Sequence, residues 1–579
     1  MQVSARVARA LRLEGVARGE SISIAAAAVD CLFLSAVTAV SLLRYVGDLG
    51  FYYDDYSVLK RMSLSEDQSL LGLYDSVRPA TGQRPLQAFT FATLYRFFGV
   101  DALGYHIWNG FLLVAIAALL YLVLRELRLP RLICVAVPLI YSTIPHYATN
   151  RFWVNAFQIN VSIACYLLSL YAGLRAVRAS PPALIAWLLI AIAGVVGSLF
   201  AYEVVFPLFA LNLALIWWTR RRIRADVNGL VVPMVTGALA VVILAAGLTK
   251  LAFVAEHGQN TYRIGFESGF PHHLAYLISG SVKLHLGTYF VAFPYVLWWI
   301  FVHHFSVVNA IVAGIAGMSS LAYLWRIGRR EPSVFDTSGI SRALVAVGVL
   351  ALFLGYVIFL TSQSVLFRSA GIDNRVNAGA ALGLAGLLVG TIGWLAGRLT
   401  PHRRVIAFST AVACVVAVGV FVIQTVASFW TSAAQQQQAI MTSIAQASGA
   451  KPAWKTLILD GVCAENGPAV IFADQWDLTG ALQVHYDDPS LRADVAQETM
   501  RATSRELGID MTFLDRFSTR FYAYGPDLAV YDFTRRRLYR LFDRRQAARY
   551  LADSRPSFAC PLQRSFAWGF DPFSRWSLL

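Results

Sequence analysis

The sequence predicts a polytopic, all-α membrane protein with a small α/β domain at its C-terminus. Of the 579 residues, 57% are apolar and 14% are charged, whereas about 25% are charged in a typical soluble domain. Apolar runs repeatedly approach the about 20 residues that a helix needs to cross a bilayer. After residue 430 these runs give way to polar and strand-like segments, which indicates a separate C-terminal domain.

The first predicted span is an apolar run over residues 22–43, and four arginines lie before residue 20. The run is longer than the about 7 to 15 residues of a signal-peptide core, so we expect an uncleaved anchor. Because basic residues stay on the cytoplasmic side, the N-terminus is predicted to be cytoplasmic.

Ten further apolar runs predict ten more spans, at 104–124, 132–146, 155–174, 183–201, 204–218, 229–254, 307–325, 342–361, 378–396 and 405–428. Arginines fill alternate connections, among them Arg125, Arg175, Arg326 and Arg398. The positive-inside rule then places the C-terminus outside. We therefore expect about eleven transmembrane helices, in a multi-pass protein of a bacterial cytoplasmic (inner) membrane.

Residues 286–302 form another apolar run that could cross the membrane. A full span there would place the arginines near residue 326 outside, against the positive-inside rule. Pro294, Trp298 and Trp299 within the run, and His303 after it, favour an interfacial or re-entrant helix instead.

This topology divides the chain into a transmembrane module, residues 1–429, and an extracytoplasmic C-terminal domain, residues 430–579. It also leaves two large outside loops, 48–103 and 255–306, the first with an aromatic-rich amphipathic stretch that predicts a loop helix. In the C-terminal domain the patterns predict strands at 456–459, 469–473 and 528–533 and an amphipathic helix at 493–507.

Charge and cysteine content limit the classes of function. The formal charge of +15 comes mainly from arginines beside apolar runs, so it indicates topology rather than nucleic-acid binding. Four of the six cysteines lie in apolar runs, and none has the spacing of a zinc site. Cys463 and Cys560 lie in the predicted outside domain, where an oxidising compartment would favour a disulfide between them.

The first loop opens with Asp54 and Asp55 directly outside the first span. Adjacent carboxylates at a membrane surface could serve as a general base or bind a cation. A solvated acidic turn is the alternative interpretation. Tryptophans at span ends, Trp153 among them, fit interfacial belts.

Short motifs follow in a characteristic order: a span, Asp54-Asp55-Tyr56, Arg84-Pro85-Leu86, Phe98-Gly99, Gly104-Tyr105-His106, a second span and a basic joint. This order resembles the N-terminal module of the GT-C superfamily of polyprenyl-phosphate-dependent glycosyltransferases, especially the protein O-mannosyltransferase-like branch. The resemblance covers about residues 20–225 and extends as topology to 428. One departure is Gln83, where the branch often has Tyr.

The resemblance implies an inverting glycosyltransferase on the extracytoplasmic side, with a polyprenyl-phosphate sugar donor and a glycan, lipid or protein acceptor. Asp54 is the first choice for the catalytic base and Asp55 the second. No cofactor is expected, and a divalent metal is not favoured because only the acidic pair is seen. The sugar and the acceptor stay open.

A lipid-phosphate leaving group needs positive charge. Candidates on the predicted outside are Arg375, which is our first choice, with Arg84, Arg368 and Lys283. Arg375 and Arg368 break the positive-inside pattern where a span resumes, which is expected if they bind phosphate. Pairing of an arginine with Asp373, or with membrane lipid headgroups, is the alternative.

Three further residues are candidates for orienting groups or for contacting the acceptor: Glu203, His106 and His146. Each lies at the outside end of a predicted span. Glu203 could equally cap the following helix, and the two histidines could be structural. Asp30 lies within the first span and is either a functional site or a polar packing contact.

Two other classes of function remain open from the sequence. A transporter or flippase for a lipid-linked or amphipathic solute would also need acidic and arginine groups, but such proteins usually show internal repeats, and none is evident. A non-catalytic assembly protein on the same fold is the other alternative, because fold does not fix activity.

Overall fold

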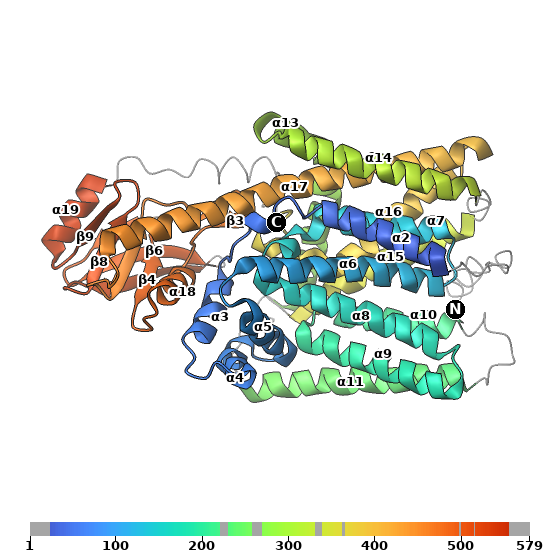
Figure 1. Cartoon of the computed structure of the whole chain (residues 1–579), viewed down its shortest axis with the longest axis horizontal. Coiled ribbons are helices and arrows are strands. Elements are labelled where there is room, and N and C mark those ends of the chain that lie inside the picture. Colours follow the sequence, from blue (N-terminus) through green and yellow to red (C-terminus); the bar gives the residue numbers. More distant parts are fainter. Residues whose placement is uncertain are drawn as a thin grey trace.

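The computed structural model describes residues 24–219, 230–257, 269–330, 338–361, 365–496, 499–513 and 516–554. Nearly parallel helices form a bundle, and one long helix leads from the bundle into a C-terminal α/β domain (Figure 1). The protein is thus a mostly helical polytopic membrane protein with a small strand-containing domain at its C-terminus. We call the end of the bundle near this domain the domain end.

Each of the eleven predicted spans coincides with a helix. They are α2 (Ile24–Val40), α6 (Ala102–Glu126), α7 (Arg131–Thr143), α8 (Phe157–Ala176), α9 (Pro181–Ala201), α10 (Phe209–Thr219), α11 (Val231–His257), α14 (Val307–Arg330), α15 (Ser338–Val357), α16 (Ala378–Ala396) and α17 (Pro401–Ser448). Within the described part of the chain, eight helices are long and apolar enough to cross a membrane, or ten if two bent pairs each count as one span. Two more apolar helices are shorter, at 24–40 and 206–219.

Helix α7 stops at Thr143, and the chain bends by 65° into the 3₁₀ helix η2 (Pro145–Arg151). Ile144 takes an extended conformation (φ −73°, ψ 140°) because it precedes Pro145. The break leaves η2 at the domain end of the bundle, next to residues that define the candidate site.

The segment before α14 consists of α12 (Phe270–Val282), a π-helical turn η5 (Lys283–Val291) and α13 (Phe293–His303), with a 60° bend before α13. Helix α11 ends and α14 begins at the domain end (Figure 1). Residues 270–303 therefore start and finish at the same end, as expected for an interfacial or re-entrant segment.

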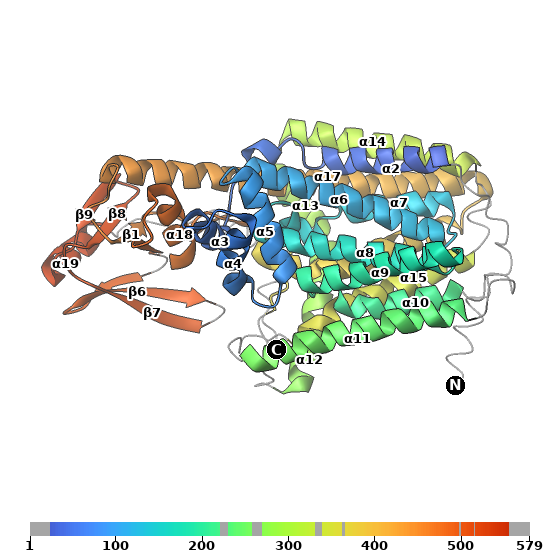
Figure 2. The same ribbon diagram turned by 60° about the horizontal axis from the view of Figure 1, so that its bottom comes forward.

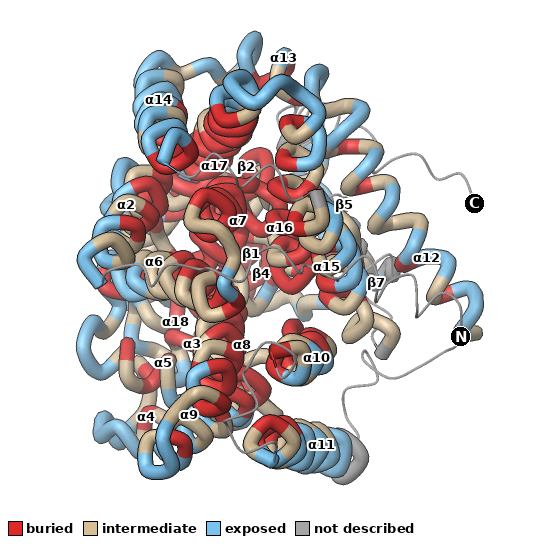
Figure 3. Tube along the Cα trace, turned by 90° about the vertical axis from the view of Figure 1, so that its right-hand side faces the viewer, coloured by how far each residue is buried: buried red, intermediate tan, exposed pale blue. Residues whose placement is uncertain are grey.

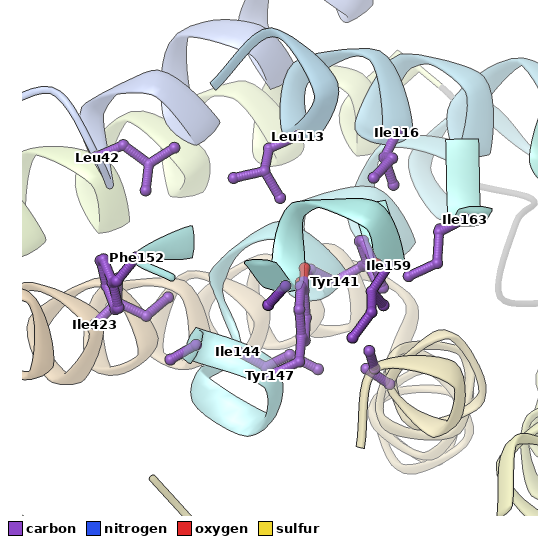
Figure 4. Packing of buried hydrophobic residues seen from close by; sticks show 14 of the residues in the cluster. Leu42, Leu113, Ile116, Tyr141, Ile144, Tyr147, Phe152, Ile159, Ile163 and Ile423 are labelled. Carbon is purple, nitrogen blue, oxygen red and sulfur yellow. The ribbon is translucent and has the colours of Figure 1, made fainter. Parts of the chain in front are cut away.

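The core follows the inner faces of the bundle. Buried residues concentrate on α7, α16 and α17 when the molecule is viewed along the bundle (Figure 3). Helix α7 is buried on all sides, consistent with a helix that is apolar all round. Figure 4 shows its Tyr141 packed beside Tyr147, with Ile159 of α8 close by; Leu113 of α6 belongs to the same apolar cluster.

Asp30 is a packing contact between four helices. Its carboxylate accepts hydrogen bonds from the Tyr121 and Tyr323 hydroxyls, each at 2.6 Å, and forms an ion pair with Arg131 at 2.7 Å. These partners come from α6, α14 and α7. Because a buried charge is tolerated when it is fully paired, Asp30 ties α2 to its neighbours.

Three short helices fill the first loop: α3 (Asp54–Ser63), α4 (Leu70–Thr81) and α5 (Pro85–Phe98). The predicted aromatic loop helix corresponds to α5, which begins with proline in its first turn, a favourable position for that residue. All three lie between the bundle and the C-terminal domain (Figure 2).

The C-terminal domain contains a sheet with the order β4-β1-β8-β9. Strands β4 (Arg492–Val495), β1 (Thr456–Asp460) and β8 (Leu528–Asp532) are parallel, and β9 (Arg537–Arg540) is antiparallel to β8. A second, antiparallel sheet contains β5 (Thr499–Ala502), β6 (Glu506–Phe513) and β7 (Arg516–Ala523), and β2 (Glu465–Asn466) pairs with β3 (Ala469–Val470). Two helices complete the domain, α18 (Gln475–Tyr486) and α19 (Arg544–Ser554).

The predicted strands at 456–459, 469–473 and 528–533 overlap β1, β3 and β8, but the predicted helix at 493–507 is wrong. Those residues form β4, β5 and the start of β6, because Ala493 to Val495 pair with β1 and this tertiary pairing overrides the local pattern. The helix lies earlier, at α18, where Asp474 and Asp477 form a capping box.

Cys463 of this domain is disulfide-bonded, while Cys31, Cys134, Cys165 and Cys414 form no disulfide. Cys560 lies outside the described residues, so its pairing with Cys463 stays a prediction.

Candidate active site at the domain end of the bundle

Four elements meet at the domain end: the start of α3, the 3₁₀ helices η3 (Val154–Ala156) and η8 (Ile372–Asn377), and α18 of the C-terminal domain. Asp54 comes from α3, and Arg375 from η8. Trp153 links the two segments, because its ring lies 4.9 Å from the Arg375 guanidinium and 6.3 Å from the ring of Tyr53, the residue before Asp54.

The backbone before α3 is strained. Tyr53, the residue before the helix, has φ 51° and ψ −117°, a conformation that a residue with a Cβ rarely adopts. The turn is held by its neighbours, since the Trp153 indole donates to the Tyr52 carbonyl at 3.0 Å and the Tyr52 amide donates to Asp55 Oδ2 at 2.9 Å. Such strain persists only where the surroundings fix the backbone, and it is concentrated at functional sites.

Asp55 anchors this turn. One carboxylate oxygen accepts from the Tyr52 amide, and the other accepts from the Asn155 amide at 2.8 Å. Asp55 is 2% exposed, and this burial raises the pKa of its carboxyl well above the usual range. Since both oxygens are occupied by backbone donors, Asp55 is suited to hold the turn.

Asp54 is the first residue of α3 and keeps part of its surface exposed. Burial raises the pKa of Asp54, and the charge of Arg375 together with hydrogen bonding by Trp476 and Asn155 acts against that rise. Asp474 of the C-terminal domain raises the pKa further by charge repulsion. Asp54 is thus a partly accessible carboxylate beside a fixed positive charge.

Arg375 is positioned by the chain that carries it. The preceding residue, Asn374, is buried and donates to the His146 carbonyl at 2.9 Å and to the Ser369 carbonyl at 2.8 Å. Thr149 donates to the Gly371 carbonyl, which also ties η8 to η2. The guanidinium of Arg375 lies 4.9 Å from the centre of the Trp153 ring, a cation–π distance.

The C-terminal domain closes one side of the site. The Trp476 ring of α18 lies 5.4 Å from the Tyr53 ring. Gly480 allows α18 to approach α3 closely, because a Cβ there would lie 2.5 Å from the Tyr56 carbonyl oxygen. Asp474, before α18, is held by Arg520 at 2.5 Å.

Sequence patterns did not identify Trp153 or Trp476 as site residues. The sequence predicts Trp153 in an interfacial belt. In the structure Trp153 is only 3% exposed, and its indole N–H donates a hydrogen bond to the Tyr52 carbonyl in the strained turn before α3. Two local features could have pointed to these tryptophans. Trp153 follows the break after α7, and Trp476 lies in the first turn of a helix capped by Asp474.

Arg84 and Glu203 form a separate group. Arg84 donates to both Glu203 oxygens, at 3.0 and 2.5 Å, and Lys250 approaches the same carboxylate at 3.2 Å. The Arg84 guanidinium also lies 3.9 Å from the Tyr202 ring centre. Glu203 therefore orients Arg84 and Lys250, and these two cations share a single carboxylate.

Arg368 is about half exposed and approaches Asp373 at 3.7 Å, as in the alternative pairing considered above. Lys283 begins the π-helical turn η5 and is half-buried.

The two histidines make structural contacts. His106 Nε2 lies 3.0 Å from the Gly50 carbonyl oxygen, and the residue is buried. His146 stacks on Tyr289, with ring centres 3.6 Å apart, and on His285 at 5.5 Å. His146 thus joins η2 to η5 behind the loop that carries Arg375.

Across the described ranges, no group of three or more His, Cys, Asp or Glu residues could hold a metal ion. Within these ranges the candidate site offers a carboxylate and a guanidinium. A carboxylate can accept a proton, and a guanidinium can bind a phosphate oxygen.

No protein-family model matches the chain, and no curated protein sequence matches it. Among solved structures, the chain is similar to ArnT from Cupriavidus metallidurans, in a crystal structure bound to undecaprenyl phosphate. The match covers 80% of this chain and 85% of that chain, at 13% sequence identity and a TM-score of 0.36. At this score the similarity carries no weight for function, which has to follow from the site.

Proposed function

We propose that the protein is an integral-membrane, inverting glycosyltransferase. It transfers a sugar from a polyprenyl-phosphate donor to an acceptor hydroxyl on the extracytoplasmic side. The observation that carries this proposal is geometric: the Trp153 ring lies 4.9 Å from the Arg375 guanidinium and 6.3 Å from the ring of Tyr53, the residue before Asp54. The order of motifs in the first loop and second span, which resembles the GT-C superfamily, supports it.

In the proposed reaction the acceptor oxygen attacks the anomeric carbon of the donor sugar. The bond between that carbon and the phosphate oxygen breaks, and polyprenyl phosphate leaves with the bonding electrons. Asp54 takes the proton of the acceptor hydroxyl, and attack from the face opposite the phosphate inverts the anomeric configuration. A raised pKa makes Asp54 a stronger base than an exposed carboxylate.

Arg375 supplies the positive charge for the leaving group. A guanidinium offers paired N–H donors that match phosphate oxygens and stays charged at all physiological pH values. Because Asn374 fixes η8 against η2, the guanidinium needs little reorganisation as negative charge develops on the phosphate. Asp55 positions the base by holding the turn before α3.

The site argues against the transporter alternative. A transporter needs polar groups near the membrane midplane that can exchange partners. The acidic residue Asp30 within α2 is instead fully occupied by Arg131, Tyr121 and Tyr323. Asp54, in contrast, begins α3, which lies between the bundle and the C-terminal domain (Figure 2). The Arg375 guanidinium lies 4.9 Å from the ring of Trp153, whose indole bonds to the turn before α3.

The test uses the full chain in lipid nanodiscs with a panel of undecaprenyl-phosphate sugars. Release of undecaprenyl phosphate that depends on the wild-type chain, and is lost in Asp54→Asn, supports the proposal. Activity should persist in EDTA, because we expect no divalent metal. If the wild-type chain neither binds undecaprenyl phosphate nor releases it from any donor in the panel, the proposal fails.

A further inference from the structure

The outer end of the C-terminal domain carries a dense set of arginines. Six are exposed, on the turn between β8 and β9, at the start of β9 and on α19: Arg535, Arg536, Arg537, Arg544, Arg545 and Arg549. The two elements form one surface, because Arg535 donates to the Asp553 carbonyl at the end of α19 and the Tyr539 and Tyr550 rings lie 5.0 Å apart. We call this surface the arginine face.

The fold directs these arginines outward. Ala547 and Tyr550 are the buried residues of α19, and Tyr550 donates to Asp460 at 2.7 Å, so the helix is fixed to the sheet. Arg545 and Arg549 are four residues apart and therefore share the opposite, solvent-facing side. Exposed acids on the same elements are fewer, namely Asp543 and Asp553. Asp532 also pairs with Arg535 at 3.8 Å, and six arginines against these three acids leave the arginine face with a net positive charge.

The turn between β8 and β9 is strained at Arg536. Arg536 has φ 52°, the left-handed region in which glycine or asparagine is favoured at the end of a tight hairpin turn. Asp532 holds the turn by accepting from the Arg535 amide at 3.0 Å and from Thr534 at 2.8 Å. A glycine would relieve the strain at position 536, so the side chain that is present there is a candidate for function.

The position of the arginine face excludes the headgroups of the membrane that holds the chain. Helix α17 has 48 residues, or about 72 Å at about 1.5 Å per residue, whereas a bilayer core is about 30 Å thick. Helix α17 therefore extends well beyond the bilayer, and α19 lies at the outer end of the domain (Figure 1). At physiological salt, surface charges are screened beyond about 8 Å. The arginines of this face are therefore too far from the lipid headgroups to attract them.

We propose that the arginine face binds an acidic polysaccharide. The partner must carry repeated negative charges, because the arginines are spread over two elements rather than gathered in one pocket. The disulfide at Cys463 indicates an oxidising compartment, where nucleic acid is not the expected polyanion. This part of the argument rests on the extracytoplasmic placement given under the proposed function.

The experiment measures binding of the full chain in nanodiscs of neutral lipid to polygalacturonate, a linear carboxylated polysaccharide. The main variant is Arg544→Gln with Arg545→Gln and Arg549→Gln, since glutamine keeps helix propensity while it removes charge. Arg492→Gln is the control, because Arg492 is exposed on β4 at the other edge of the same sheet.

We expect wild-type binding that weakens as salt rises, at least a tenfold loss in the triple variant and no change in Arg492→Gln. Arg536→Gly should also weaken binding while it raises the melting temperature, which separates binding from folding. The proposal is overturned if the triple variant binds as tightly as wild type. It is also overturned if the wild-type chain ignores polygalacturonate but binds single-stranded DNA or anionic vesicles. No donor lipid is used, so a failed transferase assay leaves this result unaffected.

Discussion

At the scale of residues, two adjacent aspartates have different environments. Asp55 accepts hydrogen bonds from backbone amides with both oxygens, whereas Asp54 is partly exposed and is influenced by the charge of Arg375. We expect Asp54→Asn to lower transfer by about 10²- to 10⁴-fold with an unchanged melting temperature, because an amide cannot accept the proton. Asp55→Asn should instead lower stability by about 1–3 kcal/mol, because a backbone amide loses its acceptor. Transfer assays and thermal melts separate the two effects, and undiminished turnover in the double variant would contradict the catalytic role.

Arg375 has two measurable effects. Arg375→Gln should weaken donor binding more than acceptor binding, and Arg375→Lys should restore it only in part, because lysine lacks the guanidinium fork. The charge of Arg375 also lowers the pKa of Asp54. Transfer requires ionised Asp54, so activity should rise with pH through that pKa, and Arg375→Gln should move the rise to higher pH. A pH–rate profile that keeps its position in Arg375→Gln would show that the two groups are not coupled.

At the scale of elements, the close approach of α18 to α3 depends on Gly480. A Cβ at position 480 would meet the Tyr56 carbonyl oxygen at 2.5 Å, so Gly480→Val should push the two helices apart. We expect transfer to fall at least tenfold while the C-terminal domain stays folded. Gly110→Ala is the control, because a Cβ there meets nothing within 4 Å. Equal activity in wild type and Gly480→Val, with α18 shown by limited proteolysis to be displaced, would remove the C-terminal domain from the site.

A comparison of the predicted elements with the observed ones shows which features the sequence could predict. Long apolar runs identify helices because each must satisfy its own backbone in the bilayer, and all eleven predicted segments are helical. The local pattern failed at 493–507, where pairing with β1 decides the structure. In the candidate site, Asp54 and Arg375 stand out by charge near span ends. Trp153 and Trp476 do not, because their placement depends on the break after α7 and on the docking of α18.

At the scale of the whole molecule, the eleven-span arrangement predicts that the C-terminal domain lies outside the cytoplasmic membrane. A membrane-impermeant thiol reagent applied to intact cells should label this domain only after reduction, because Cys463 is disulfide-bonded. The variant Cys463→Ser with Cys560→Ser should abolish that labelling. Labelling that requires opened cells would place the domain inside and remove the extracytoplasmic site.

The location of the lipid phosphate tests the proposed function most directly. A cryo-EM structure of the full chain with undecaprenyl phosphate should show the phosphate within hydrogen-bond distance of Arg375, with Asp54 facing the space where the anomeric carbon would lie. The polyprenyl chain should run along the bundle toward the membrane interior. A phosphate bound at the opposite end of the bundle, or at the Arg84–Glu203 pair with Arg375 unoccupied, would contradict the assignment of the active site.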